Sequence, residues 1–206
     1  MDGETFTVAY VPGVTVSKWA RIWAERSPAC RLELLGVTDT EQTAVLHEGR
    51  AQMSFVRLPV EREGLHVIPL YAELAVVVVP REHPVALFEA VTLAELAEEP
   101  RVADEAISEL LASVAAGLGI VILPQSLARL HSRRDLVYRT VTDQPPTQVG
   151  LAWLTENSNE QVEEFIGIVR GRTVNSSRAG RTAEASPPPR EAQRARTRSS
   201  NRRRRR

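Results

Sequence analysis

The first half of the chain alternates between strand-like and helix-like patterns of apolar residues. A run rich in β-branched and aromatic residues predicts a strand at 6–11, and further strands are expected at 31–35 and 52–58. Helical spacing between the first two runs predicts a buried face of Val16, Trp19, Ala20 and Trp23. Thr15 or Ser17 is expected to cap this helix, and a weaker helix is expected from Thr38 or Asp39 to Glu48. Because strands and helices alternate through short links, the pattern predicts right-handed crossovers and a parallel sheet.

The second half continues with the same two patterns. Residues 65–80 predict two strands around Pro69, and the run Val76–Val79, apolar on both faces, suits a central strand. Further strands are expected at 120–123, 136–141 and 148–154. Thr92 is expected to cap a short helix over 93–99, and Asp104 a longer one. The longer helix has an apolar stripe of Ile107, Leu110, Leu111, Val114 and Ala115, and a final helix has one of Val162, Phe165, Ile166 and Val169.

The apolar pattern ends near Arg170, and the composition changes there. From Gly171 onward Ser, Pro and Arg accumulate, so residues 171–206 are expected to be a disordered Arg-rich tail. Residues 1–170 carry 14 Lys and Arg against 24 Asp and Glu, a net charge of −10, whereas residues 171–206 carry 12 Arg against two Glu, a net charge of +10. The tail could contact nucleic acid or an acidic partner, or fold back on its own acidic body.

Several function classes lack their usual signatures in this sequence. Cys30 is the only cysteine, which excludes an intramolecular disulfide, and the four histidines show no metal-binding spacing. No G-x-S-x-G motif or phosphate-binding loop is present, so we expect no enzyme activity, no cofactor and no metal. The start MDGETFTVAYV has no signal-peptide pattern, and no apolar run reaches membrane-spanning length. We therefore expect a cytoplasmic protein that does not contact a membrane.

Four segments, in this order, carry a resemblance to a known family. They are FTVAYVPG, LHEGRAQMSFVRLPVEREGLHVIPLY, AVVVVPREHPVA followed by TLAELAEEP, and VAAGLGIVILPQSLARL. Together they resemble the effector-binding (substrate-binding) domain of LysR-type transcriptional regulators, from Phe6 to about Gly171. The resemblance implies an α/β fold of the type 2 periplasmic-binding-protein class, two-lobed, with mostly parallel sheets flanked by helices. It assigns residues 1–72 and 147–170 to lobe I and residues 73–146 to lobe II.

The sequence departs from the family pattern in three places. Regulators of this family begin with a helix-turn-helix, for which the stretch before Phe6 has no room, so we expect a stand-alone effector-binding protein. The family has a longer stretch between the equivalents of Pro100 and Asp104, so lobe II is expected to be shortened. Gln52 stands where the family prefers Asp, which removes a charge from the start of that strand.

The resemblance also implies that a ligand binds in the cleft between the lobes. Carried over by position, three loops that follow strands line one wall, and their candidate residues are Gly13, Val14, Thr15, Val37, Thr38, Asp39, Arg57, Leu58 and Pro59. In an open α/β sheet, ligands sit beyond the carboxyl ends of strands, where helix amino-termini present unpaired N–H groups. Two capped helices and the Arg57 guanidinium would favour an anion. The resembled family commonly takes organic acids as effectors, so the resemblance implies a small organic acid here.

Several of these polar and charged residues also have a plainer interpretation. Hydroxyl residues near helix starts often serve only as caps, which here applies to Thr15, Ser17 and Thr38. Arg57 could be a solvated charge at the strand end, paired with Glu61 or Glu63. Asp39 would repel an anion unless its carboxylate is turned outward as a cap.

Two functions from different classes follow from these observations. The first is a LysR-type substrate-binding-domain protein that binds an anionic effector between its lobes and acts in transcriptional regulation. The alternative is a nucleic-acid-associated interaction protein whose tail binds phosphates without sequence specificity, through Arg202, Arg203, Arg204, Arg205 and Arg206. Since the resembled family pairs its domains, a homodimer is also expected, although Trp19 and Trp23 fit the core better than an interface.

Overall fold

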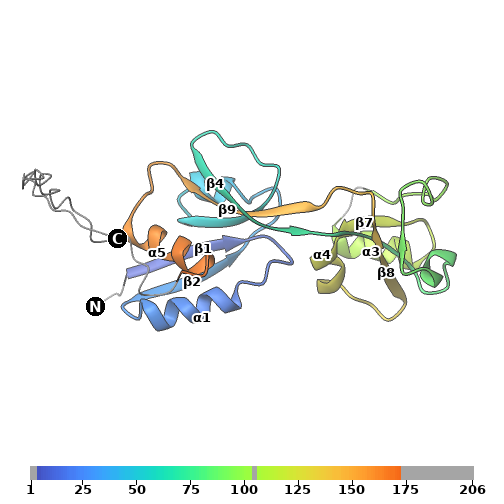
Figure 1. Cartoon of the computed structure of the whole chain (residues 1–206), viewed down its shortest axis with the longest axis horizontal. Coiled ribbons are helices and arrows are strands. Elements are labelled where there is room, and N and C mark those ends of the chain that lie inside the picture. The colour runs from blue at the N-terminus through green and yellow to red at the C-terminus, as the bar shows by residue number, and fades with distance from the viewer. Residues whose placement is uncertain (1–3, 104–105, 173–206) are drawn as a thin grey trace, which may run out of the picture. The chain divides into compact units, whose positions relative to one another are not determined.

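The computed structural model describes residues 4–103 and 106–172 (Figure 1). In chain order the elements are β1 (Glu4–Tyr10), α1 (Ser17–Arg26), β2 (Cys30–Gly36), α2 (Ala44–His47), β3 (Met53–Arg57), β4 (Leu65–Glu73), β5 (Ala75–Pro80), the 3-10 helix η1 (Pro84–Leu87), β6 (Ala90–Val91), α3 (Ile107–Ala115), β7 (Val121–Pro124), α4 (Gln125–Leu130), β8 (Leu136–Val141), β9 (Thr147–Leu154) and α5 (Glu160–Val169). The predicted cap Asp104, and the predicted tail from residue 173 onward with Arg202–Arg206, lie outside the described residues. None of the described helices is long and apolar enough to cross a membrane.

The first sheet has the strand order β2-β1-β3-β9-β4. β1 pairs in parallel with both β2 and β3, as the strand–helix–strand pattern predicts. β9 lies between β3 and β4 and runs antiparallel to both. Because β1, β2 and β3 point the same way, the loops that follow them leave the sheet at one edge, where ligands bind in open α/β sheets.

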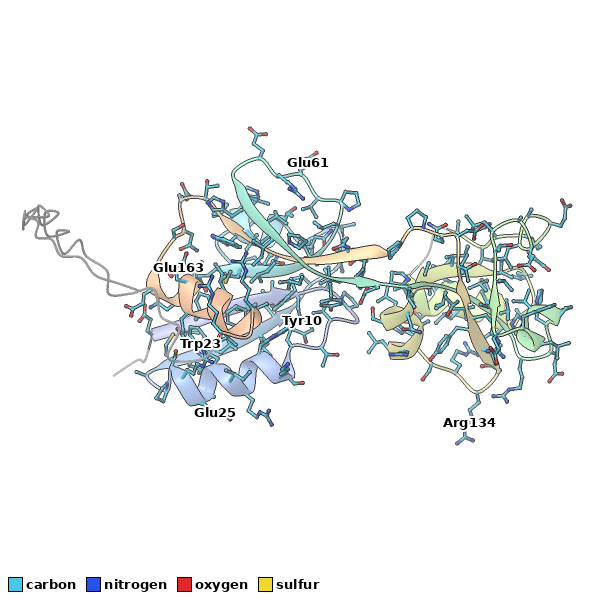
Figure 2. The ribbon with its side chains drawn as sticks, viewed as in Figure 1. Tyr10, Trp23, Glu25, Glu61, Arg134 and Glu163 are labelled. Carbon is cyan, nitrogen blue, oxygen red and sulfur yellow. The ribbon has the colours of Figure 1, made fainter. Side chains whose placement is uncertain are left out.

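Aromatic rings fill the core of the first sheet. Phe6 of β1 stacks on Trp23 of α1 with 4.9 Å between ring centroids, and Phe165 of α5 lies 5.8 Å from each of them. Trp19 stacks on Phe55 of β3 at 4.7 Å. Trp23, labelled in Figure 2, lies on the side of α1 that contacts α5. Trp23 is buried and Trp19 packs against the same core, so the prediction that both tryptophans belong to the core is confirmed.

The second sheet has the order β6-β8-β5-β7 and is mostly antiparallel. Only β6 and β8 run parallel among its described pairs. Alternate valines of β5 face two cores, Val77 and Val79 toward η1 and Leu96, and Val76 and Val78 toward α3 and α4. The predicted central strand is therefore confirmed, but the prediction of mostly parallel sheets is wrong here. A strand buried on both faces is apolar throughout in either orientation, so its pattern does not reveal the direction of its neighbours.

Two local predictions in the second half are also wrong. β4 continues through Pro69 with a register shift between Pro69 and Tyr71, so the break falls at Leu74 instead. Proline has no amide hydrogen to donate to the neighbouring strand, and the register shift accommodates this missing hydrogen bond without ending β4. Residues 93–98 form a run of turns and no helix, although the Thr92 hydroxyl accepts a hydrogen bond from the Glu95 amide at 3.3 Å.

The two sheets have separate cores. The first sheet and its helices α1, α2 and α5 contribute to one apolar cluster, and the second sheet contributes to two others, one on each face. β1–β3, β9 and all of β4 except its last residue, Glu73, fall in the part of the sequence assigned to lobe I, and β5–β8 fall in the part assigned to lobe II. The division of the chain into two lobes stays a prediction.

Candidate functional site

The segments that follow β1 and β2 meet the end of β4 at the side chain of Arg57. Arg57 is the last residue of β3, and only 9% of its side chain is exposed. Its Nη2 donates to the Pro12 carbonyl at 3.0 Å, and its Nη1 donates to Asp39 Oδ1 at 2.9 Å. Its Nε and Nη2 donate to Glu73 Oε2 at 3.4 and 3.3 Å. One guanidinium therefore joins the loop after β1, the loop after β2 and the end of β4.

The backbone of Arg57 is held by a second residue, Gln42, which the sequence analysis missed. The Arg57 amide donates to Gln42 Oε1 at 2.7 Å, and Gln42 Nε2 donates to the Arg57 carbonyl at 3.3 Å. On the next residue, the Leu58 amide donates to the Gln148 carbonyl of β9 at 2.8 Å. Both the main chain and the side chain of Arg57 are thus fixed, so the guanidinium is held in one orientation.

Two carboxylates face the single guanidinium, but their surroundings differ. The Glu73 side chain is 6% exposed, whereas the Asp39 side chain is 48% exposed. The formal charge of the three groups together is −1. Burial and the charge of Glu73 raise the pKa of Tyr71, while Arg57 opposes the shift. No group of three His, Cys, Asp or Glu side chains that could hold a metal ion occurs in the described part of the chain.

The loop after β1 brings three of the predicted residues to this edge. Gly13 has a positive φ of 88°, and a Cβ on it would lie 2.5 Å from the Ser126 Oγ of α4. The Val14 side chain is buried in the core, and Thr15 is exposed. The Ser126 hydroxyl is buried and has no hydrogen-bond partner among the described residues. A glycine is therefore required where α4 approaches the loop.

The predicted caps of α1 and α2 are wrong. Neither α1 nor α2 has a side-chain cap, and their N-cap residues are Val16 and Thr43. The Thr38 amide and hydroxyl both donate to Glu41 Oε2, at 3.1 and 2.8 Å, which lowers the pKa of the Glu41 carboxyl. These bonds close a turn, and the helix begins only at Ala44. The expected pocket of two capped helices is thus reduced to the guanidinium and the loop backbone.

The plainer interpretations of the charged residues are also corrected. Arg57 pairs with Asp39 and Glu73 rather than with Glu61 or Glu63. The Asp39 carboxylate is turned inward onto the guanidinium instead of outward as a cap. Leu58 and Pro59 follow Arg57 directly and are joined by a cis peptide bond. The structure thus brings Arg57 together with the two other predicted loops, but with its charge already paired.

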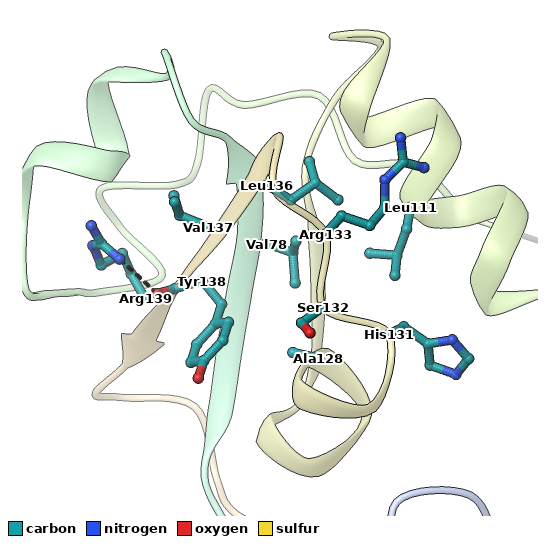
Figure 3. A pocket seen from close by; sticks show the side chains of 10 residues that line it. All are labelled: Val78, Leu111, Ala128, His131, Ser132, Arg133, Leu136, Val137, Tyr138 and Arg139. Atoms are coloured by element: carbon teal, nitrogen blue, oxygen red, sulfur yellow. Dashed lines mark hydrogen bonds between the residues drawn. The ribbon is translucent and has the colours of Figure 1, made fainter.

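A separate hollow of about 390 Å³ lies on the α3–α4 side of the second sheet (Figure 3). It is lined by Val78, Leu111, Ala128, His131, Ser132, Arg133, Leu136, Val137, Tyr138 and Arg139. Arg133 is bound to Asp135 by two hydrogen bonds of 3.0 and 2.7 Å, which lowers the pKa of Asp135. None of the predicted ligand-binding residues lines this hollow. Sequence spacing could not reveal it, because β5, α3, α4 and β8 meet only in the folded chain.

Comparison with known proteins identifies the family. The family model of the LysR substrate binding domain matches residues 4–109 and 105–173. The two matched segments meet beside the stretch where the sequence predicts a shortened lobe II.

Three curated regulators are similar to the chain over most of its length. They are the HTH-type transcriptional regulator AlsR of Bacillus subtilis strain 168 (23% identity, 72% of this chain and 59% of the relative), the Hca operon transcriptional activator HcaR of Escherichia coli strain K12 (23%, 84% and 70%) and a probable hydrogen peroxide-inducible genes activator of Mycobacterium avium (26%, 74% and 59%). The chain therefore spans 59 to 70% of the length of these relatives.

Solved structures show the same fold. The BenM effector binding domain with its effector benzoate superposes with a TM-score of 0.67 at 20% identity, over 81% of this chain and 90% of that one. The reduced form of OxyR gives 0.69 at 22%, over 82% and 95%. The predicted α/β class is thus confirmed, and the matched family is one of regulator domains rather than of enzymes. Since the family model covers nearly all described residues, the chain belongs to the family of LysR substrate-binding domains.

Proposed function

We propose that the chain binds a small organic acid at the edge where β1, β2 and β3 end, and that this binding serves transcriptional regulation. The observation that carries the proposal is the guanidinium of Arg57, which joins two strand-end loops and the end of β4. The ligand would lie between the lobes, against Gly13, Val14, Thr15, Thr38, Arg57, Leu58 and Pro59. As a regulator domain, the chain would work in the cytoplasm as a homodimer.

The chemistry of Arg57 suits a carboxylate. A guanidinium presents a planar fork of donors that matches carboxylate geometry, and its charge persists at any physiological pH. Nη1 is already bound by a carboxylate, that of Asp39, at 2.9 Å, and this carboxylate is half exposed to solvent. A ligand carboxylate could take the same place. The BenM domain, which has the same fold, has a small organic acid, benzoate, as its effector.

Glu73 links the proposed ligand site to the connection between the two sheets. Glu73 is the last residue of β4, and one residue, Leu74, separates it from β5 of the second sheet. The Leu74 carbonyl accepts a hydrogen bond from the Gln125 amide at the start of α4, at 2.9 Å. A ligand that shifts Arg57 together with its bound Glu73 would therefore act on the connection between the sheets. Such a change is the kind of differential contact on which a ligand-driven switch depends.

Titration calorimetry on the full chain with benzoate, succinate and citrate tests the proposal. We expect at least one acid to bind, and Arg57→Lys to weaken it by about tenfold or more, because an ammonium lacks the fixed donor directions with which one guanidinium can hold Glu73, the Pro12 carbonyl and a ligand at once. The variant His131→Ala, in the hollow of Figure 3, should bind with unchanged affinity and serves as the control. A folded protein that binds none of the acids, or an Arg57→Lys variant that binds as tightly as the wild type, would contradict the proposal.

A further inference from the structure

The guanidinium expected to bind the ligand is already bound by the protein's own carboxylates. Resting on the function proposed above, we infer that Asp39 determines the specificity of this site by competing with the ligand carboxylate for Arg57. The competition is local and reversible: the Asp39 carboxylate leaves Nη1, and the ligand carboxylate replaces it.

The two carboxylates on Arg57 are not equally able to leave. The Glu73 side chain is 6% exposed, so separating it from Arg57 would leave a buried charge without a partner. The Asp39 side chain is 48% exposed, and water can solvate its carboxylate once it moves away. Nη1 donates to Asp39, whereas Nε and Nη2 hold Glu73 and the Pro12 carbonyl. A ligand would therefore take Nη1 and leave the other bonds in place.

The loop around Asp39 allows this exchange without refolding. Thr38 is bound to Glu41, and Gln42 is bound to the backbone of Arg57, so both sides of Asp39 are held. Among the described residues, the Asp39 carboxylate has Arg57 as its hydrogen-bonding partner and no second one. A rotation of the Asp39 side chain is thus enough to release Nη1 while the loop backbone stays in place.

The charge of the cluster sets which ligands can compete. With Glu73 and Asp39 against one guanidinium, an approaching anion meets a site of formal charge −1. The ligand loses affinity both because it must break the Asp39 bond and because the displaced carboxylate stays nearby as a like charge. Simple carboxylates should therefore bind weakly. Acids with further contacts in the loops would be selected over them.

The test compares benzoate with the uncharged benzamide, titrated into the full chain and its Asp39→Asn variant. Asparagine keeps the size of the side chain and removes its charge. We expect benzoate to bind about tenfold more tightly to the variant, from the lost ion pair and the lost repulsion together. Benzamide should show no comparable gain. Asp39→Ala, which removes the acceptor as well, should raise benzoate affinity at least as much.

Glu33→Gln is the matched control, because it removes one exposed carboxylate from β2, where the side chain is 4.0 Å from Arg31 and away from Arg57. It should leave benzoate affinity unchanged. If the wild type binds benzoate and Asp39→Asn binds it no more tightly, or if the control gains as much, the inference about Asp39 is wrong while the ligand site stands. If neither protein binds benzoate, succinate or citrate, the ligand site itself is wrong.

Discussion

Replacing Arg57 with methionine should lower the free energy of unfolding by about 3 kcal/mol, because it leaves the carboxylate of Glu73 buried without its partner. The pair lies at 3.3 Å, and both side chains are less than a tenth exposed. The same change also removes the bond to the Pro12 carbonyl, which ties the loop after β1 to the end of β3. Urea denaturation of the full chain, followed by tryptophan fluorescence, measures the effect.

Two further variants assign this loss to the buried pair. Asp39→Asn removes the half-exposed partner and should cost no more than about 1 kcal/mol. The double variant Arg57→Met with Glu73→Gln should recover part of the stability, because the remaining amide carries no charge. A loss below 1 kcal/mol in Arg57→Met, or no recovery in the double variant, would show that the pair does not stabilise the strand ends.

Replacing Phe165 with alanine should lower the free energy of unfolding by about 4 kcal/mol, the usual range for a phenylalanine cut back in a packed core. Phe165 is fully buried in α5, and its ring lies 5.8 Å from Phe6, 5.8 Å from Trp23 and 6.1 Å from Phe55. The cavity would open between α1, α5 and the first sheet, so that the helices lose their common contact.

The matched control is the same substitution at an exposed site. Phe88 follows η1 and is 53% exposed, so Phe88→Ala should change the free energy of unfolding by no more than about 0.5 kcal/mol. Equal losses at the two positions, measured in urea under the same conditions, would mean that the aromatic cluster is not the centre of this core.

Local patterns in the sequence were enough to predict the frame of the first sheet. β1 comes from a run of β-branched and aromatic residues, β2 and β3 are short apolar segments between helix signals, and the spacing of Trp19 and Trp23 identifies the buried side of α1. The direction of the second sheet was beyond such patterns, because Val76–Val79 is apolar on both faces whichever way its neighbours run. The predicted caps of α1 and α2 were wrong for a related reason: the sequence alone does not show which hydrogen bond a hydroxyl near a helix start makes.

The position of Arg57 could be predicted, but its partners could not. The residue ends a strand, and strand ends of a parallel sheet meet at one edge. Its partners Glu73 and Gln42 lie 16 and 15 residues away, and no short-range spacing links them to Arg57. The sequence places the charge of Asp39 beside the predicted ligand site, but only the folded loop shows that its carboxylate turns inward onto Arg57. Pairings across a sheet depend on tertiary contacts rather than on neighbouring residues.

The most direct test of the ligand site is an amide ¹H–¹⁵N spectrum of the full chain, titrated with benzoate or with whichever acid binds in calorimetry. The account predicts that the largest shifts occur at Gly13, Thr38, Arg57 and Leu58, together with the Nε–H of Arg57. Largest shifts at Ser132 and Tyr138, in the hollow of the second sheet, would contradict it, as would a spectrum that does not change.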